Sequence, residues 1–508
     1  MRDVDNEEGD IDDIDYWTIC WIYIAYGIII FVGKIADLID KIRGHRYFIT
    51  PKGYAPLFVE FEYFYQMRLY SRIKDCWDRP ICSLPGAWID VMLRTNQHYS
   101  EPLEYVLVGI LDGLLTFCLF RNKFRITGET KRCLNLGSYN YLGFAQNEGP
   151  IAEAVIESMY KYGGFTSSTP AEDGTTEPFR LLERETARFV GKEDALVFEM
   201  GFATNSGSLP ALVGKGALII SDSLNHASLA TGCKNTGTKI KVFKHNDTKH
   251  LEQVIRESII QGQPKTHRPW TMILIIVEGI YSMEGEIGNL PEIIRIKKKY
   301  NCYLYVDEAH SIGALGSHGR GVCDHYDVDP KDVDILMGTF TKSFGSIGGY
   351  IAADKSLIDH LRQSSFAYLY ANSMAPPCAM QAYQALRAIA GDDGTDIGAR
   401  KIKQLKENSN FFRERLRQMG FQILGGKDSP VVPLMFYNPS KIATFSRMCL
   451  ERHIAVVVVG YPATPLTSPR ARFCLSASHT REDLEWALEH LDTIGDQMNL
   501  KFKKPIKV

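Results

Sequence analysis

Short apolar runs that alternate with helical stretches constrain the fold of this 508-residue chain more than any other feature. Several runs are almost continuously apolar, as in strands that are covered on both faces of a sheet. The alternation predicts an α/β fold with a mostly parallel central sheet, flanked by helices such as 248–261 and 290–300. The predicted strands lie at 195–199, 217–221, 239–244, 271–279, 302–309, 334–340 and 349–353.

The chain is too long for one hydrophobic core, because cores stop growing at roughly 250–300 residues. The alternating block predicts a large domain over 134–394. From 395 a long helical segment, 399–420, precedes three strand-like runs and a closing helix at 481–497. Because strands and helices no longer alternate here, this pattern predicts a smaller α+β domain over 395–508.

The N-terminal region differs in composition from the rest of the chain. Residues 1–15 are acidic and we expect them to be disordered. Residues 16–33 carry no charge and basic residues follow them, which predicts a transmembrane anchor with the remaining chain in the cytosol, although a buried core helix is the alternative. Residues 34–133 then form a membrane-proximal segment, in which two carboxylates argue against a second span at 103–120.

Charge and cysteine usage exclude two classes of function. The net charge of −2 and the pI near 6.7 provide no basic field, so nucleic-acid binding has no electrostatic support. The 11 cysteines include no C-x-x-C pair, which argues against a zinc site and against a disulfide framework. We therefore expect reduced thiols and no metal.

The ends of the predicted strands carry the candidate chemistry, because ligands bind beyond the carboxyl ends of strands in open α/β sheets. Lys342 follows 334–340, and Asp307 lies near the end of 302–309. A lysine amine forms a Schiff base with an aldehyde, and pyridoxal phosphate sites pair that lysine with an acid at the pyridine nitrogen. A surface charge and a helix cap are the ordinary alternatives for these two residues. A helix starting near Gly201 could also bind a phosphate, so the combination favours pyridoxal phosphate.

Several longer motifs resemble those of the α-oxoamine synthase family. Within it they are most similar to the lysine-bearing subunit of the enzymes that use L-serine. The resemblance runs from about 72 to about 500 and implies the fold of the type I pyridoxal phosphate-dependent aminotransferases. The motifs are IVEGIYSMEGE, VDEAHSIGALG, GRG, GTFTKSFGSIGGY, SPVVPLM, GYPATP and RARFCLSASHT.

The resemblance implies roles for residues around the cofactor ring. Lys342 forms the Schiff base, Asp307 pairs the pyridine nitrogen and His310 contacts the ring hydroxyl. His226 stacks on the ring, and the implied catalytic residues are Lys342, His226 and Asp307. The implied contacts outside the ring are Gly201, Phe202 and Thr339 to the phosphate, and Ser282 near the cofactor.

The resemblance also implies a substrate site. Arg472, with Arg470 as a second candidate, holds the substrate carboxylate, for which a planar guanidinium suits bidentate recognition. Tyr139, Asn140 and Tyr141 line the substrate entrance.

The implied activity is the condensation of L-serine with palmitoyl-CoA, with loss of carbon dioxide, to give 3-ketodihydrosphinganine. The implied partner is a lysine-free homologous subunit, in a heterodimer at the endoplasmic reticulum membrane with the catalytic domain facing the cytosol. Another α-oxoamine synthase with a different amino acid or acyl-CoA, or a non-catalytic subunit of the same complex, are the alternatives.

Three positions depart from the family pattern. Pro170 and Phe179 stand where the family usually has an arginine and a histidine, and Asn372 stands where it usually has a hydroxyl residue. These departures concern substrate preference and subunit contacts more than the reaction class.

Overall fold

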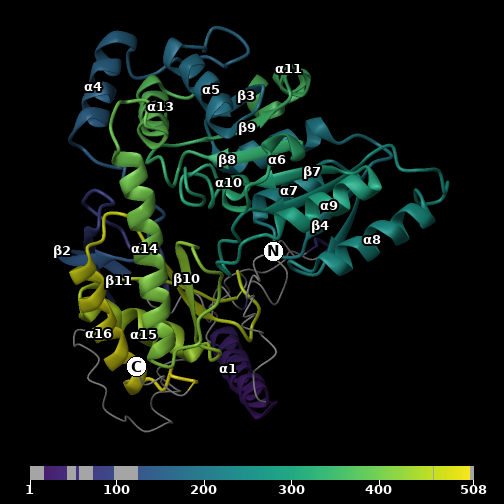
Figure 1. Ribbon diagram of the computed structural model, residues 1–508. Helices are drawn as coiled ribbons and strands as arrows, with labels where there is room; N and C mark the ends of the chain where they lie inside the picture. The colour runs from purple at the N-terminus through teal and green to yellow at the C-terminus, as the bar shows by residue number, and fades with distance from the viewer. Residues whose placement is uncertain are drawn as a thin grey trace.

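The computed structural model describes residues 16–42, 53–55, 64, 73–96, 124–461 and 463–503 (Figure 1). The prediction of disorder at 1–15 and the argument against a second span at 103–120 concern residues outside the described ranges.

A seven-stranded sheet forms the centre of the large N-terminal part (Figure 1). Its order is β3-β9-β8-β7-β6-β4-β5; β9 runs antiparallel to both neighbours, and the remaining pairs are parallel. The prediction of a mostly parallel sheet is confirmed, and every predicted strand is present. The strands are β3 (Asp194–Phe198), β4 (Leu218–Asp222), β5 (Lys239–Phe243), β6 (Ile273–Glu278), β7 (Tyr303–Asp307), β8 (Ile335–Thr339) and β9 (Gly349–Ala353).

Helices pack around this sheet because most of its strands are buried on both faces, as their continuous apolar sequences predict. α5 packs on β3 and β9, α6 on β8 and β9, and α8 on β4 and β5. The elements of this part are α4 (Pro150–Tyr162), α5 (Glu177–Val190), α6 (Gly201–Leu212), α7 (Ala227–Asn235), α8 (Thr248–Gln261), α9 (Leu290–Tyr300), α10 (Val322–Tyr326), η4 (Pro330–Asp332), α11 (Lys355–Ser364), α12 (Phe366–Leu369) and α13 (Pro376–Ala390).

The C-terminal part is an α+β layer along the long helix α14 (Figure 1). Two three-stranded sheets lie in it: β10-β13-β12, which is antiparallel, and β1-β2-β11. β2 crosses the predicted boundary at 134 and pairs with β11, so part of 34–133 belongs structurally to this layer. The elements are η3 (Lys74–Cys76), β1 (Trp88–Asn96), β2 (Phe124–Asn135), α14 (Ile397–Gln418), β10 (Val431–Met435), α15 (Ser440–Glu451), β11 (Ile454–Ala455), β12 (Val457–Val459), β13 (Arg470–Cys474) and α16 (Arg481–Gln497).

The segment predicted as a membrane anchor is helical, within α1 (Tyr16–Ile42). Ile22 and Tyr26 of α1 are buried against Leu424, Met435 and Tyr437 of the C-terminal layer. Within the described ranges, no helix is long and apolar enough to cross a membrane. The prediction of a transmembrane helix at 16–33 is therefore not supported, since α1 packs one side on protein.

Candidate active site

The predicted site residues converge at the carboxyl ends of β6, β7 and β8. Glu278, Asp307 and Thr339 are the last residues of these three strands, and Lys342 follows three residues after Thr339. Gly201 is the first residue of α6, and His226 immediately precedes α7. The N-termini of both helices lie at the same edge of the sheet. The parallel arrangement of the strands thus brings together residues that are far apart in the sequence.

Lys342 has the properties of an amine that reacts rather than of a surface charge. It is partly buried, and this burial lowers the pKa of its amine to about 8. Its Nζ lies 5.3 Å from the centroid of the Tyr139 ring, and the Arg472 guanidinium lies 4.6 Å from the same ring. Across the described chain, Lys342 forms no ion pair. An amine of this pKa is neutral in about a tenth of molecules at pH 7, far more than an ordinary lysine.

The loop after Lys342 depends on two glycines. Gly345 and Gly348 have φ angles of +64° and +79°, and a Cβ at either would clash with backbone atoms, of Ala145 and of Phe198 respectively. Glycine is required here for close approach of backbone to backbone. The loop that presents Lys342 is fixed by these contacts.

Asp307 is buried and has its carboxylate held from two sides. The Ala309 N–H donates to Oδ1 at 2.9 Å, and the Asn205 side-chain amide donates to Oδ2 at 2.7 Å. Two donors from different elements hold the carboxylate in one orientation. Asp307 is thus arranged to pair with a protonated ring nitrogen.

His226 caps the N-terminus of α7. Its backbone N–H donates to Glu278 Oε1 at 2.5 Å, and its Nδ1 accepts from the Ser228 N–H at 3.2 Å. Burial lowers the pKa of its imidazole, and the charge of nearby Lys342 lowers it further, against the opposing effect of Asp307. The ring lies 6.3 Å from that of Phe202. His226 is therefore a neutral imidazole beside the start of α6.

His310 and Tyr141 form a buried pair. The Tyr141 hydroxyl lies 2.7 Å from His310 Nδ1, and burial keeps the pKa of His310 well below its ordinary value. Tyr141 is fully buried, so the prediction that it lines a substrate entrance is not supported by its position. Its side chain positions His310, whose ring lies 4.9 Å from that of Tyr139.

The start of α6 and the end of β8 form a close contact. A Cβ on Gly201 would lie 2.9 Å from Thr339 Oγ1, so only glycine lets the two elements approach this closely. α6 has no side-chain cap at its N-terminus, and the N–H groups of its first turn, including that of Phe202, lack intrahelical partners. The Thr339 hydroxyl lies 2.8 Å from both the Thr341 hydroxyl and the Gly348 carbonyl. Helix N-termini of this kind bind phosphate.

The two candidate arginines differ in their partners. Arg470 is fully buried, and its guanidinium donates to the carbonyls of Ser468 and Met283 and pairs with Glu284 at 3.3 Å. Arg472 pairs with no carboxylate among the described residues, and its buried Nε has no hydrogen-bond partner there. Arg472, and not Arg470, is available for a substrate carboxylate.

The remaining predicted positions pack against, or form hydrogen bonds with, other parts of the protein. Asn140 donates to the Pro85 carbonyl at 2.9 Å and its Oδ1 accepts from the Ala145 N–H, so it stabilises a turn. Ser282 is buried in the turn after β6. Pro170 is buried. Phe179 is fully buried in the main hydrophobic core, so the phenylalanine that stands in place of the family's histidine fills space in the core.

Two residues of the site were not assigned from the sequence. They are Glu278, at the end of β6, and Asn205, in α6. Asn205 follows Gly201 by four residues, so both lie on one face of α6. The available signal for Asn205 was its position on the same face of the helix as Gly201, the candidate phosphate contact.

These residues fit a pyridoxal phosphate. The chain offers a poorly solvated amine at Lys342, a held carboxylate at Asp307, an uncapped helix N-terminus at Gly201 and an arginine with an unpartnered buried nitrogen at Arg472. Each matches one chemical group of the cofactor or of its amino acid substrate.

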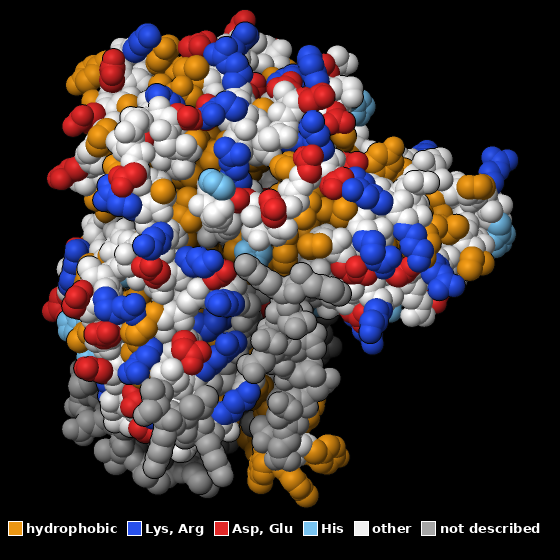
Figure 2. Space-filling model, viewed as in Figure 1, with side chains coloured by type: hydrophobic (Ala, Val, Ile, Leu, Met, Phe, Trp, Pro, Cys, Tyr) orange, Lys and Arg blue, Asp and Glu red, His pale blue; other side chains and the backbone are white. Residues whose placement is uncertain are grey.

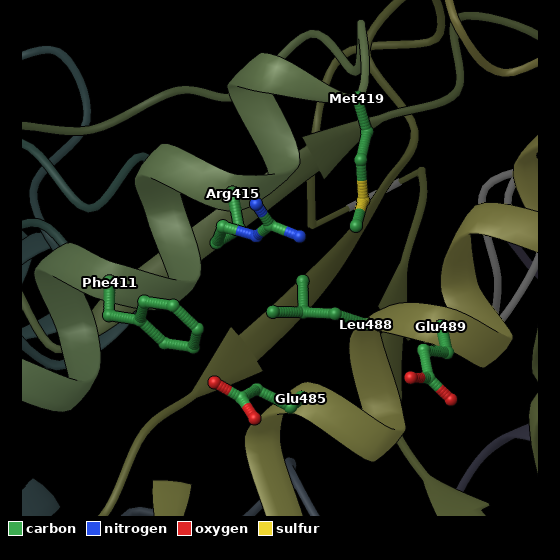
Figure 3. A pocket seen from close by; sticks show the side chains of 6 residues that line it. All are labelled: Phe411, Arg415, Met419, Glu485, Leu488 and Glu489. Carbon is green, nitrogen blue, oxygen red and sulfur yellow. The ribbon is translucent and has the colours of Figure 1, made fainter. Parts of the chain in front are cut away.

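The pocket in Figure 3 is separate from this cluster. It lies between α14 and α16 and has a volume of about 340 Å³. Its lining residues are Phe411, Arg415, Met419, Glu485, Leu488 and Glu489. None of them is a predicted site residue.

Comparisons with known proteins agree with the geometry of the site. Residues 131–491 match the family of class I and II aminotransferases. The chain is 69% identical to serine palmitoyltransferase 2 of Dictyostelium discoideum, over 99% of each chain. It is 49% identical to long chain base biosynthesis protein 2a of Arabidopsis thaliana over 96% of each chain. It is 48% identical to serine palmitoyltransferase 3 of Homo sapiens, over 95% of this chain and 85% of the human one.

Solved structures share the fold. Serine palmitoyltransferase of Sphingomonas wittichii has a TM-score of 0.68 and 28% identity, covering 74% of this chain and 90% of the bacterial one. A serine palmitoyltransferase with pyridoxal phosphate bound has a TM-score of 0.67 over the same shares. The resemblance predicted from the motifs is confirmed. The chain belongs to the class I and II aminotransferase family, in the branch of its serine palmitoyltransferase 2 and long chain base biosynthesis protein 2 relatives.

Proposed function

We propose that this chain is the lysine-bearing catalytic subunit of a serine palmitoyltransferase. It condenses L-serine with palmitoyl-CoA, with release of CoA and carbon dioxide, to give 3-ketodihydrosphinganine. The observation that carries the proposal is the convergence of the Lys342 amine, the Asp307 carboxylate and the available Arg472 guanidinium at one edge of the sheet. The names of its relatives, at up to 69% identity over 99% of the chain, support the same reaction.

Pyridoxal phosphate, when bound, supplies an aldehyde for an amine and a ring that accepts the electrons released at the Cα atom of serine. Lys342 provides the amine, and Asp307 keeps the ring nitrogen protonated. Arg472 binds the serine carboxylate through two parallel hydrogen bonds. Lys342 and His226 are the groups near the reacting Cα atom that hold and move protons.

The site includes an exposed apolar rim, which supports the proposal of a heterodimer. Met200 and Phe202 at the start of α6, and Ile347 in the loop after Lys342, are each more than 40% exposed. Phe366 and Tyr370, from the segment that packs on α6, are more exposed still. A lysine-free homologous subunit that covers this rim would exclude water from the site.

Attachment to a membrane is the second part of the proposal. α1 carries an exposed apolar stripe, repeating every three or four residues: Trp17, Trp21, Ile24, Ile28, Phe31, Ile35, Leu38 and Ile42. Hydrophobic side chains gather at the lower end of the molecule in Figure 2, where α1 lies in Figure 1. We infer that this stripe enters the interface of the endoplasmic reticulum membrane, on the cytosolic side, where acyl-CoA and the long-chain product partition.

The function is tested with the chain purified together with its lysine-free homologue. L-Serine, L-alanine and glycine are each paired with acyl-CoAs of different chain length, and the ketone product is identified by mass spectrometry. Highest kcat/KM for L-serine with palmitoyl-CoA is expected. Preference for another amino acid or a short acyl-CoA would establish a different α-oxoamine synthase, and no product with any pair would leave only the role of a non-catalytic subunit.

A further inference from the structure

A chain of buried hydrogen bonds joins the two candidate catalytic residues Asp307 and His226. Asn205 of α6 is its centre: the side-chain amide donates to Asp307 Oδ2 at 2.7 Å and to Ser228 Oγ at 2.9 Å. The Ser228 hydroxyl in turn lies 2.8 Å from His226 Nδ1. The Tyr305 hydroxyl donates to Asn205 Oδ1 at 2.6 Å. Asn205, Ser228, Tyr305 and Asp307 are all at most 3% exposed.

The orientation of the Asn205 amide follows from its neighbours. An ionised Asp307 only accepts hydrogen bonds, so the NH₂ group of Asn205 must face it. Burial keeps the pKa of Tyr305 well above its ordinary value, so its hydroxyl keeps the hydrogen that it donates to Oδ1. Both hydrogens and the oxygen of the Asn205 amide are therefore used.

The same count fixes the tautomer of His226. Because His226 Nδ1 already accepts from the Ser228 backbone N–H, the Ser228 hydroxyl meets this nitrogen as a donor, while its oxygen accepts a hydrogen from Asn205. The Ser228 N–H also donates to this nitrogen at 3.2 Å. An Nδ1 atom that accepts twice carries no proton, so a neutral His226 has its hydrogen on Nε2.

We propose that Asn205 is a positioning residue that holds the Asp307 carboxylate and the His226 tautomer through one side chain. The proposal rests on the roles of Asp307 and His226 given under the proposed function. The amide of Asn205 is fully used by protein partners, so it acts through these two residues. Tyr305 is its support, because without that donor the amide could rotate and present its oxygen to Asp307.

The test uses the chain with its partner subunit and measures the dissociation constant of pyridoxal phosphate and the pH dependence of its visible absorption. Asn205→Ala is expected to weaken cofactor binding by about 10- to 100-fold, because a charge-assisted hydrogen bond to Asp307 is lost. Tyr305→Phe is expected to weaken it by about 3- to 10-fold. Both variants should shift the pH midpoint of the absorption.

Tyr350→Phe is the matched control. Tyr350 is a buried tyrosine of β9 in the same sheet, and its hydroxyl has no hydrogen-bond partner among the described residues. Its variant should bind the cofactor within about twofold of wild type. Ser228→Ala separates the two arms: the ¹⁵N shifts of His226 should change while the cofactor dissociation constant changes less than in Asn205→Ala.

Normal cofactor affinity and an unshifted absorption midpoint in folded Asn205→Ala would overturn the proposal, even if its melting temperature falls. If Asn205→Ala does not fold, Tyr305→Phe decides: behaviour equal to Tyr350→Phe overturns the proposal, and the expected loss supports it. Asp307→Asn separates a failure of the role proposed for Asp307 from a failure of the positioning role proposed for Asn205. If that variant also binds cofactor normally, the proposed role of Asp307 fails, whereas a loss there with none at Asn205 overturns only the positioning role.

Discussion

Glu278 and Asp307 end neighbouring parallel strands and lie opposite each other in the register of β6 and β7. Both carboxyl groups are buried. Burial, and then the charge of Asp307, raise the pKa of Glu278 well above its ordinary value. Two carboxylates this close in a buried site do not both ionise, so Glu278 is the neutral member of the pair.

We therefore predict that Glu278→Gln is tolerated. A glutamine is neutral at this site and its Oε1 can still accept the His226 backbone N–H, so kcat should stay within about fivefold of wild type. Glu278→Ala leaves that N–H without an acceptor and should lower kcat by about 10- to 100-fold. Steady-state kinetics of the two variants checks this. Equal losses in both would show that Glu278 acts through its charge.

Arg472 and Arg470 provide a matched pair, two residues apart on β13. Arg472→Lys should raise KM for L-serine by about 10- to 100-fold, because a point charge replaces a bidentate contact, and should leave cofactor affinity unchanged. Arg470→Met leaves the buried Glu284 without its partner, so we expect it to lower the melting temperature instead. Serine kinetics and thermal unfolding separate these outcomes. A raised KM in Arg470→Met at normal stability would reverse the assignment.

The positions of these residues mark what the sequence could predict. Lys342 and Asp307 were singled out because each lies at the end of an apolar strand, whereas the role of His226 came from the family resemblance. The family resemblance ranked Arg472 above Arg470, but the local pattern could not separate them, since both lie on the same face of β13 and it is the distant Glu284 that pairs with Arg470. The buried contact of Tyr141 with His310, 169 positions along the chain, was invisible in the local pattern for the same reason.

The N-terminal helix shows a second limit. Residues 16–33 were predicted to be helical and apolar, and both are correct, but composition could not indicate that Ile22 and Tyr26 pack on β10 and its surroundings. Pairing of β2 with β11, across more than 300 positions, was likewise invisible in the local pattern. Long-range packing decides such questions.

His245 gives a prediction for stability against pH. Burial alone lowers its pKa, but the hydrogen bond to Asp222 and the ion pair with Glu286 outweigh that effect and raise the pKa to about 10. A raised pKa contributes stability below the unfolded value near 6.5 and loses it as pH rises through about 10. His245→Gln should lower the free energy of unfolding by about 1–3 kcal/mol at pH 6 and by much less at pH 10. A pH-independent difference in urea unfolding would contradict the assigned ion pairs.

Membrane attachment is tested on the exposed side of α1. The double variant Trp21→Glu and Phe31→Glu keeps the contacts of Ile22 and Tyr26 intact and should release the protein from vesicles of endoplasmic reticulum lipid composition. Ile260→Glu, at an apolar residue of α8 that is more exposed than either, is the control and should stay bound. Co-sedimentation of the three proteins measures this. Full binding of the double variant would exclude the α1 stripe as the attachment.

The central claim is that the Lys342 amine carries the cofactor, and borohydride reduction tests it most directly. The protein, purified with its partner and loaded with pyridoxal phosphate, is reduced, digested and mapped by mass spectrometry. We expect the pyridoxyl mass on Lys342 in the wild type, and neither that adduct nor ketone product with Lys342→Ala. An adduct on a different lysine of the wild type, or product formation by Lys342→Ala, would contradict it.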